Sequence, residues 1–298
     1  MLRKLTDLHE LARKHRKKKL VLAAAHDQNA LEAVINASGN GIVDVVLVGN
    51  EHKIKEICEN HHLDISGFEL IHEPDIDKAA AISVKMVSEK QADIVMKGQL
   101  STSSLLKAVL NKEWGLRSGE ILSHLALFEV SSYHKLIALS DAAMNISPDF
   151  KIKVAITKNA VNYLHKLGIE KPKVAMLSAV ETVNPDMKSS FEAAAIAKMA
   201  DRGQITGCII DGPFALDNAV SEKSAKLKNI QSPVAGDADL LIGDDLDVSN
   251  ALYKAFIYFA QASCAAVIVG ATAPIVLTSR ADNDETKLNS IALAAAIN

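Results

Sequence analysis

Short apolar runs alternate with amphipathic stretches along the first half of the chain. The runs are rich in Val, Ile, Leu and Ala and cover residues 20–26, 43–49, 68–73 and 92–98. Between them, apolar residues recur with helical spacing. Continuous apolar strands separated by helices are typical of a parallel sheet that is covered on both faces. The pattern therefore predicts a doubly wound α/β domain.

A second alternation begins near Pro148. Its apolar runs cover residues 173–181, 207–213 and 238–245, and a last strand, loop and helix follow over residues 267–294. We expect this last segment to return to the first domain, because its polar loop matches the anion-binding loops expected there. The predicted fold is α/β with two doubly wound domains. The first consists of residues 1–147 plus 268–298, and the second is an inserted domain of residues 148–267.

Composition narrows the possible functions. The chain has 33 basic and 36 acidic residues, a net charge of −3, which argues against a nucleic-acid-binding protein. Its three cysteines, Cys58, Cys208 and Cys264, lie far apart without metal-ligand neighbours, so neither a disulfide framework nor a zinc site is indicated. No apolar run approaches the roughly 20 residues that span a bilayer. We expect a cytoplasmic protein without a membrane partner, and we interpret the basic run at residues 13–19 as the end of a first helix.

The last polar loop carries the first candidate site. Thr278, Ser279 and Arg280 follow an apolar strand and precede a helix. The carboxyl ends of parallel strands and the amino ends of the following helices form the edge of a sheet where anions bind. A hydroxyl and a guanidinium at this edge predict an anion site. The alternative is that Asp282 caps the helix, Glu285 completes a capping box and Arg280 is a surface residue.

The loop after the run at residues 92–98 carries the second candidate site. Gly98 permits close approach of the backbone, hydroxyls crowd a helix start at residues 101–104, and Lys97 and Lys107 flank it. Hydroxyls such as those of Ser101 and Thr102 suit a phosphate, although a helix needs only one of them as its N-cap.

Further polar residues interrupt the apolar segments that follow. They are Arg117, His124 and Asp141, which are candidate substrate-binding residues. The alternative is that His124 is a core residue and that Asp141 caps or turns the chain.

Several motifs are absent. There is no Walker A sequence, and the glycines of residues 39–44 lie between a predicted helix and a strand, the reverse of a dinucleotide fingerprint. Nucleotide hydrolysis and nicotinamide chemistry therefore lose support. An acidic run comprises Asp237, Asp239, Asp244, Asp245 and Asp247. Its spacing does not match a calcium loop, and Asp247 is placed to cap a helix, so no metal site is expected.

Six segments resemble the phosphate acetyl/butyryltransferase family. They are MKGQLSTSSLLKAVL, LSDAAMN, AMLSAVETVNPDM, DGPFALDNAVSE, GDADLLIGDDLDVSNALYKAF and, most specific of all, APIVLTSRADNDETKLNSIALA. The resemblance runs from about Leu20 to the end and is strongest to the phosphate butyryltransferase branch. It implies a two-domain fold similar to that of isocitrate and isopropylmalate dehydrogenases, with the active site in the cleft between the domains.

The resemblance also implies an activity, the reversible transfer of a butyryl or similar short acyl group between coenzyme A and inorganic phosphate. Acyl-CoA, phosphate and acyl phosphate would be the ligands, with no tightly bound cofactor, and the protein would form a dimer or larger homo-oligomer. Three alternatives stay open. They are a phosphate acetyltransferase, a decarboxylating dehydrogenase of related fold, and a non-catalytic sensor of acyl-CoA or phosphate.

Residue roles follow from the same resemblance. Ser279 matches the family serine that stabilises the oxyanion, whereas Arg280, Lys107 and the hydroxyls near Thr102 are placed to bind phosphate. The acetyltransferase branch has an aspartate seven positions after the serine, where this chain has Thr286, which cannot act as a base at neutral pH. Asp282 or Glu285 is then the candidate base. Lys107 also stands where acetyltransferases have arginine.

Overall fold

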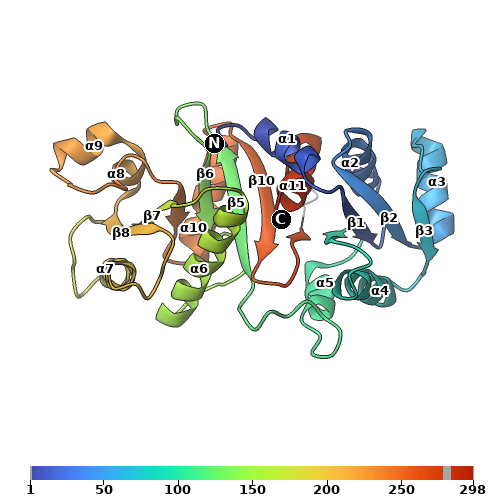
Figure 1. Ribbon diagram of the computed structural model, residues 1–298, viewed down its shortest axis with the longest axis horizontal. Coiled ribbons are helices and arrows are strands. Elements are labelled where there is room, and N and C mark those ends of the chain that lie inside the picture. The colour runs from blue at the N-terminus through green and yellow to red at the C-terminus, as the bar shows by residue number, and fades with distance from the viewer. Residues whose placement is uncertain (1, 278–282, 298) are drawn as a thin grey trace. The chain divides into compact units, whose positions relative to one another are not determined.

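Apolar strands and amphipathic helices alternate along most of the chain in the computed structural model, which describes residues 2–277 and 283–297 (Figure 1). The chain divides into two compact units. Unit 1 consists of Met1–Leu5 and Ile121–Cys264, and unit 2 consists of Thr6–Glu120 and Ala265–Asn298. Each unit combines a largely parallel sheet with helices, which confirms the predicted α/β class.

Unit 2 is built on strands in the order β3-β2-β1-β4-β11-β10. They are β1 (Lys18–Ala23), β2 (Val43–Gly49), β3 (Glu69–His72), β4 (Ile94–Lys97), β10 (Ser263–Val269) and β11 (Ile275–Val276). The first five in that order run parallel, and β10 is antiparallel to β11. The central strands β1 and β4 bury nearly every side chain, which is why the sequence shows continuous apolar runs.

The helices of unit 2 connect these strands. They are α1 (Thr6–Lys14), α2 (Gln28–Gly39), α3 (Glu51–His61), α4 (Ile76–Ser88), α5 (Thr102–Val109) and α11 (Asp284–Ala295). Helix α11 packs against α1 and α2, whereas α4 packs against α5, so that helices cover both faces of the sheet (Figure 1). Because α1 ends at Lys14 and β1 begins at Lys18, the basic run spans the connection between them. Arg13 and Lys14 lie in the last turn of α1, as predicted, whereas the rest of the run continues into β1.

The last strand of the sequence prediction is two strands in the structure. Strand β10 ends at Val269, the chain turns over residues 270–274, and β11 returns antiparallel to β10. Gly270 has a φ of 88°, which an L side chain rarely adopts. The apolar character continues through the turn, so hydrophobicity alone predicts one strand there. The outcome is that β11 lies between β10 and β4 and runs parallel to β4.

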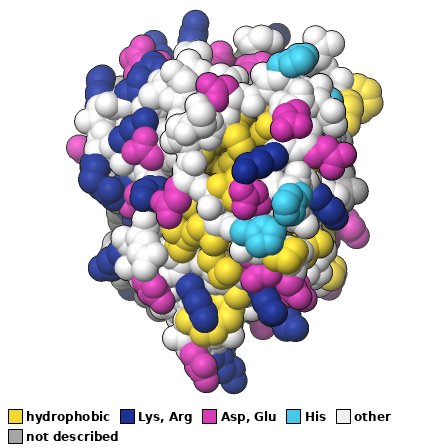
Figure 2. Space-filling model, turned by 90° about the vertical axis from the view of Figure 1, so that its right-hand side faces the viewer, with side chains coloured by type: hydrophobic (Ala, Val, Ile, Leu, Met, Phe, Trp, Pro, Cys, Tyr) yellow, Lys and Arg dark blue, Asp and Glu magenta, His cyan; other side chains and the backbone are white. Residues whose placement is uncertain are grey.

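Strand β3 is the edge strand of unit 2, and Figure 2 views the end of this unit that carries α3 and β3. Acidic, basic and histidine side chains are interspersed there with small apolar patches. Lys55 pairs with Glu51 at 2.6 Å, and the rings of His52 and His72 meet edge to face with centroids 6.0 Å apart. Both signs of charge share this face, in agreement with the nearly balanced composition.

Unit 1 has strands in the order β5-β6-β9-β7-β8. They are β5 (Ser123–Glu129), β6 (Ile137–Ser140), β7 (Lys173–Leu177), β8 (Ile209–Phe214) and β9 (Leu240–Ile242). Only the β5–β6 pair is antiparallel among them. The helices are α6 (Phe150–Lys166), α7 (Lys188–Asp201), α8 (Leu216–Val220), α9 (Glu222–Leu227) and α10 (Leu246–Tyr258).

The units and the predicted domains change over at different residues. The units change at 5/6, 120/121 and 264/265, whereas the predicted domains change at 147 and 268. Strands β5 and β6 thus pack with unit 1, although the sequence pattern assigned them to the first domain. The division into domains stays a prediction. Among the described residues, no helix combines the length and apolar character needed to cross a bilayer.

Candidate active site

The strands that precede the two predicted anion-binding loops are direct neighbours in unit 2. Strand β4 lies between β1 and β11, with Ala23 beside Lys97 and Val276 beside Met96. Because all three strands run parallel, their carboxyl ends open at one edge of the sheet. The loops that follow β4 and β11 therefore start side by side.

Gly98 brings the loop after β4 against the end of β1. Its N–H donates to the carbonyl oxygen of Ala23 at 2.8 Å, and the N–H of Gln99 donates to that of Ala24 at 2.8 Å. A Cβ at position 98 would lie 2.4 Å from the oxygen of Ala24. The close approach predicted for Gly98 is therefore to the protein's own backbone, and it fixes where the loop leaves the sheet.

The hydroxyls predicted at the start of α5 form a small cluster. Ser101 is the N-cap, and its Oγ accepts from the N–H of Ser104 at 3.0 Å. The same oxygen lies 2.8 Å from the Oγ of Ser103 and 3.0 Å from that of Ser104. Thr102 is exposed in the first turn. One hydroxyl thus caps the helix, and the others add donors at a helix start that already favours anions.

The two predicted lysines lie at opposite ends of this segment. The Lys97 ammonium donates to the carbonyl oxygens of Gly98 and Leu100, both at 3.3 Å, so it lies over the loop. Lys107 is exposed in the last turn of α5. At 1.5 Å per residue it lies roughly 7 to 8 Å along the helix axis from Thr102. Lys97 thus contacts the loop before the hydroxyl cluster, whereas Lys107 lies one helical turn after Ser103 and Ser104.

Arg117 belongs to the segment that runs beside the β10–β11 turn. The N–H of Thr272 donates to the oxygen of Leu116 at 2.9 Å, and the Oγ of Ser118 donates to the oxygen of Gly270 at 2.5 Å. The Arg117 side chain is exposed. This turn precedes β11, whereas the predicted anion loop follows it, so the Arg117 backbone lies near the other end of that short strand.

The predicted catalytic stretch is only partly covered by the structure. Ser279, Arg280 and Asp282 lie outside the described residues. The described chain resumes with Asn283, the N-cap of α11, whose Oδ1 accepts from the N–H of Thr286 at 2.8 Å. The alternative in which Asp282 caps this helix was therefore wrong. Glu285 is exposed in the first turn of α11, and Thr286, the next residue, is partly buried.

Asp141 in unit 1 organises its own loop. Its Oδ1 accepts from the N–H groups of His124, Ala143 and Met144 at 3.0 to 3.1 Å. Its Oδ2 accepts from the N–H and from the side-chain amide of Asn145. The carboxylate is 4% exposed, and these donors occupy both of its oxygens. Asp141 thus stabilises a turn of the backbone, which is the alternative that the sequence left open beside substrate binding.

His124 is buried beside Asp141 at the start of β5. Its ring meets Tyr253 edge to face, with centroids 5.9 Å apart, and among the described residues its Nδ1 has no hydrogen-bond partner. Burial lowers the pKa of His124, and the nearby charge of Asp141 opposes this shift only in part. The imidazole is therefore neutral at physiological pH.

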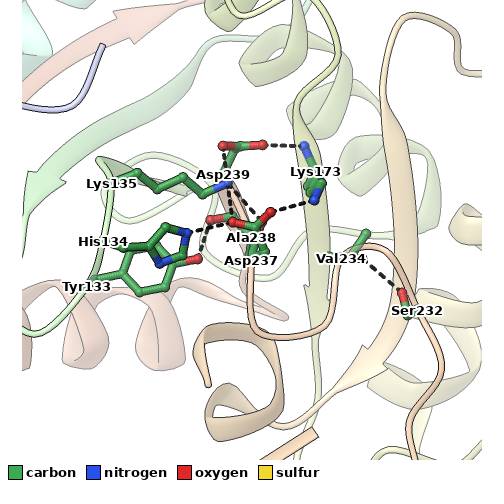
Figure 3. Close-up of polar contacts among 9 residues, drawn as sticks. All are labelled: Tyr133, His134, Lys135, Lys173, Ser232, Val234, Asp237, Ala238 and Asp239. Atoms are coloured by element: carbon green, nitrogen blue, oxygen red, sulfur yellow. Dashed lines mark hydrogen bonds and ion pairs between the residues drawn. The ribbon is translucent and has the colours of Figure 1, made fainter. Parts of the chain in front are cut away.

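Part of the acidic run forms an ion-pair network at the amino edge of the unit 1 sheet (Figure 3). Asp237 lies 2.5 Å from Lys173, 2.9 Å from Lys135 and 2.7 Å from His134, and Asp239 lies 2.6 Å from Lys135. Burial alone would raise the pKa of Asp237, but hydrogen bonds from Lys173, Lys135 and His134 outweigh it and hold that pKa far below its usual range. These carboxylates link residues at the starts of the neighbouring strands β6, β7 and β9.

Two further residues of the acidic run, Asp244 and Asp245, also have structural partners. Asp244 pairs with the buried Lys153, and Asp245, not Asp247, caps α10 by accepting from the N–H of Val248 at 2.9 Å. Our assignment of the cap to Asp247 was wrong by two positions. Within residues 2–277 and 283–297, no group of His, Cys, Asp and Glu is arranged to hold a metal ion.

Sequence reasoning missed two buried lysines, Lys153 and Lys287, which are each 3% exposed. Both occur at helical positions whose neighbours one turn away are buried, Thr157 for Lys153 and Ile291 for Lys287. A lysine on an apolar helix face is the signal that could have identified them.

Comparison with known proteins identifies the family. A family model described as "Phosphate acetyl/butaryl transferase" matches residues 4–80 and 72–295. The phosphate butyryltransferase of Clostridium acetobutylicum is 46% identical over 280 residues, which cover 94% of this chain and 93% of that protein. The phosphate acetyltransferase of Thermotoga maritima is 44% identical over 98% of both chains.

A solved structure agrees with these sequence matches. The branched-chain phosphotransacylase from Enterococcus faecalis V583 superposes with a TM-score of 0.84 at 33% identity, and the alignment covers 94% of this chain and 98% of that one. The likeness extends over both units rather than over one motif. The chain belongs to the phosphate acetyl/butyryl transferase family.

Proposed function

We propose that this protein transfers a short acyl group, butyryl or similar, reversibly between coenzyme A and inorganic phosphate. The observation that carries the proposal is the 46% identity to a phosphate butyryltransferase over nearly the full length of both chains. Coenzyme A acts as a substrate and product in this proposal. The cytoplasmic location and the homo-oligomeric state stay predictions.

The reaction needs no covalent enzyme intermediate. A phosphate oxygen attacks the thioester carbonyl, a tetrahedral oxyanion forms, the carbon–sulfur bond breaks, and the coenzyme A thiolate takes up a proton. In the reverse direction the thiolate attacks the acyl phosphate carbonyl. The protein must hold phosphate, stabilise the oxyanion and manage the thiol proton.

Phosphate binding is assigned to the carboxyl edge of unit 2. Arg280 supplies a fork of donors for two phosphate oxygens. The loop after β4 adds the hydroxyls of Ser101 and Thr102, and Lys97 adds positive charge beside them. Support for this assignment comes from the register that sets β4 beside β11. Lys107, one turn after Ser103 and Ser104, and Arg117 add further positive charge in this proposal.

Oxyanion stabilisation is assigned to Ser279, whose hydroxyl would donate to the developing charge. Proton transfer is assigned to a carboxylate near the start of α11, because Thr286 has no group that titrates near neutrality. Glu285 is exposed in that first turn, and Asp282 precedes it in the sequence. In unit 1, His124 and Asp141 are proposed to border the substrate, with Asp141 holding the backbone at His124.

The test is phosphate-dependent release of free thiol from butyryl-CoA by the purified protein. We expect thiol release that saturates with phosphate and yields one acyl phosphate for each thiol. Absence of thiol release with every thioester from acetyl-CoA to isovaleryl-CoA would contradict the proposal.

A second candidate is phosphate acetyltransferase activity. The 44% identity to the Thermotoga maritima enzyme supports it nearly as strongly as the butyryltransferase match supports the first. Comparison of kcat/KM for acetyl-, propionyl-, butyryl- and isovaleryl-CoA distinguishes the two. One methylene in an apolar pocket changes this ratio by about 10- to 200-fold. A higher value for acetyl-CoA would favour the second candidate.

A further inference from the structure

Lys287 is buried on the face of α11 that packs on the sheet of unit 2. Its residue is 3% exposed, four positions after the N-cap Asn283. Ser290, one turn further along the same face, accepts from the N–H of Ala266 in β10 at 3.0 Å. The Lys287 side chain therefore points towards the sheet.

The Lys287 ammonium lies beside the first turn of α11. Its Nζ is 3.4 Å from Oδ1 of Asp284, the first residue of the helix. This agrees with the general tilt of helical side chains towards the amino terminus. That turn follows β11, at the edge where β4 also ends. The ammonium is thus close to the edge to which we assign phosphate binding.

The partners of Lys287 are poor for a buried cation. An ammonium that leaves water requires close anionic partners, because desolvation strongly disfavours the charged form. Lys153 in unit 1 is equally buried and has two, Glu192 at 2.6 Å and Asp244. Within the described residues, the Lys287 ammonium has only Asp284, whose side chain is 70% exposed. A second anion would complete its surroundings.

We propose that Lys287 binds the phosphate group of inorganic phosphate or acyl phosphate. The inference rests on the proposed acyl transfer and adds a substrate-binding residue to it. A lysine supplies a compact point charge with three donors for phosphate oxygens. The phosphates of coenzyme A share this chemistry, and separate measurements for the two substrates distinguish them.

The test is the variant Lys287→Met, compared with wild type in steady-state kinetics. We expect KM for inorganic phosphate to rise at least tenfold, with KM for butyryl-CoA within twofold of wild type. Lys287→Arg, which keeps the charge, should recover part of the phosphate affinity. The matched control is Lys78→Met, since Lys78 is an exposed lysine on α4 of the same unit. Its KM values should equal those of wild type.

A second measurement does not depend on turnover. Inorganic phosphate that binds the folded state raises Tm, and we expect this rise in wild type and Lys78→Met but a clearly smaller one in Lys287→Met. Phosphate KM and Tm shifts equal to wild type in a folded Lys287→Met protein would overturn the proposal, as would a rise in KM for butyryl-CoA alone. Should this variant not fold, Lys287→Gln replaces it under the same criteria. A wild type without thiol release but with a Lys287-dependent Tm shift would contradict only the proposed activity.

Discussion

The charged groups of unit 1 and those at the carboxyl edge of unit 2 are arranged in opposite ways. In unit 1, acidic and basic side chains satisfy each other, as in the network around Asp237 (Figure 3) and in the group of Lys153 with Glu192 and Asp244. At the edge of unit 2, hydroxyls gather at the start of α5, the Lys97 ammonium rests on carbonyl oxygens, and Lys287 has one distant carboxylate.

This difference shows that charge density does not mark a binding site. The acidic run of unit 1 is densely charged, yet four of its five carboxylates pair with lysines or cap a helix. At the edge of unit 2, hydroxyls crowd a helix start, and Asp284 is the one carboxylate that the described residues place beside Lys287, which suits binding of an anion.

The largest expected effect concerns the paired lysine of unit 1. Lys153→Met leaves Glu192 and Asp244 without their buried cation, and loss of one partner of a buried ion pair costs about 3 to 5 kcal/mol. Urea unfolding should show this loss, while KM for phosphate stays at the wild-type value in the folded protein. If the free energy of unfolding of this variant equalled that of wild type, the carboxylates around Lys153 would contribute no net stability. The contrast with Lys287 would then not hold.

The next effect concerns the proposed oxyanion donor. Ser279→Ala should lower kcat by about 100-fold or more, because one donor to the developing charge is removed. The midpoint of urea unfolding should stay close to that of wild type. Initial rates of thiol release from butyryl-CoA measure the effect, with Ser131→Ala on an exposed loop of unit 1 as the control. A kcat within threefold of wild type would remove Ser279 from the mechanism.

The network in Figure 3 predicts a pH dependence of stability. The folded pKa of Asp237 lies below its unfolded value of about 4, so the pairing stabilises the protein above pH 4 and is lost as pH falls further. Because the side chain is 37% exposed, solvent screening limits the contribution to about 1 kcal/mol. Urea unfolding of wild type and Asp237→Asn should differ by that amount at pH 7, and the difference should begin to shrink below pH 4 and vanish only as the pH falls through the much lower folded pKa. A constant difference across this range would contradict the assignment.

The smallest effects separate capping from binding at the start of α5. Ser101→Ala removes the N-cap and should cost about 1 kcal/mol of stability. Thr102→Ala removes an exposed hydroxyl and should change stability by less than about 0.5 kcal/mol. If this loop binds phosphate, Thr102→Ala should still raise KM for phosphate about threefold, since one hydrogen bond contributes about 0.5 to 1.5 kcal/mol. An unchanged KM for phosphate would mean that the hydroxyl cluster caps the helix and does not bind phosphate.

Much of the fold could be predicted because it depends on local pattern. Continuous burial of β1, β2 and β4 produces the apolar runs that identify them, and capping residues such as Asp75 mark the helix starts. The prediction was wrong where local signals are weak. Apolar character continues through the turn after Gly270, and two aspartates near α10 compete for the cap position.

The candidate site divides in the same way. The crowding of hydroxyls at residues 101–104 follows from residue type and from the position after a strand, whereas only the structure decided that Ser101 is the N-cap. The burial of Lys287 was missed, because its apolar neighbour one turn away, Ile291, is a weak signal in a helix of mixed composition. The pairing of Lys153 with Asp244 joins residues that are far apart in the sequence.

The sequence by itself determined the α/β class, the order of most strands and helices, and the likeness to an acyltransferase family, because each depends on local periodicity or on contiguous motifs. Only the tertiary structure decided that β11 pairs with β4, that Gly98 packs against the end of β1, and that Lys153 is fully paired where Lys287 is not. These features depend on which distant segments of the chain become neighbours. Tertiary packing decides this, and local sequence preferences do not.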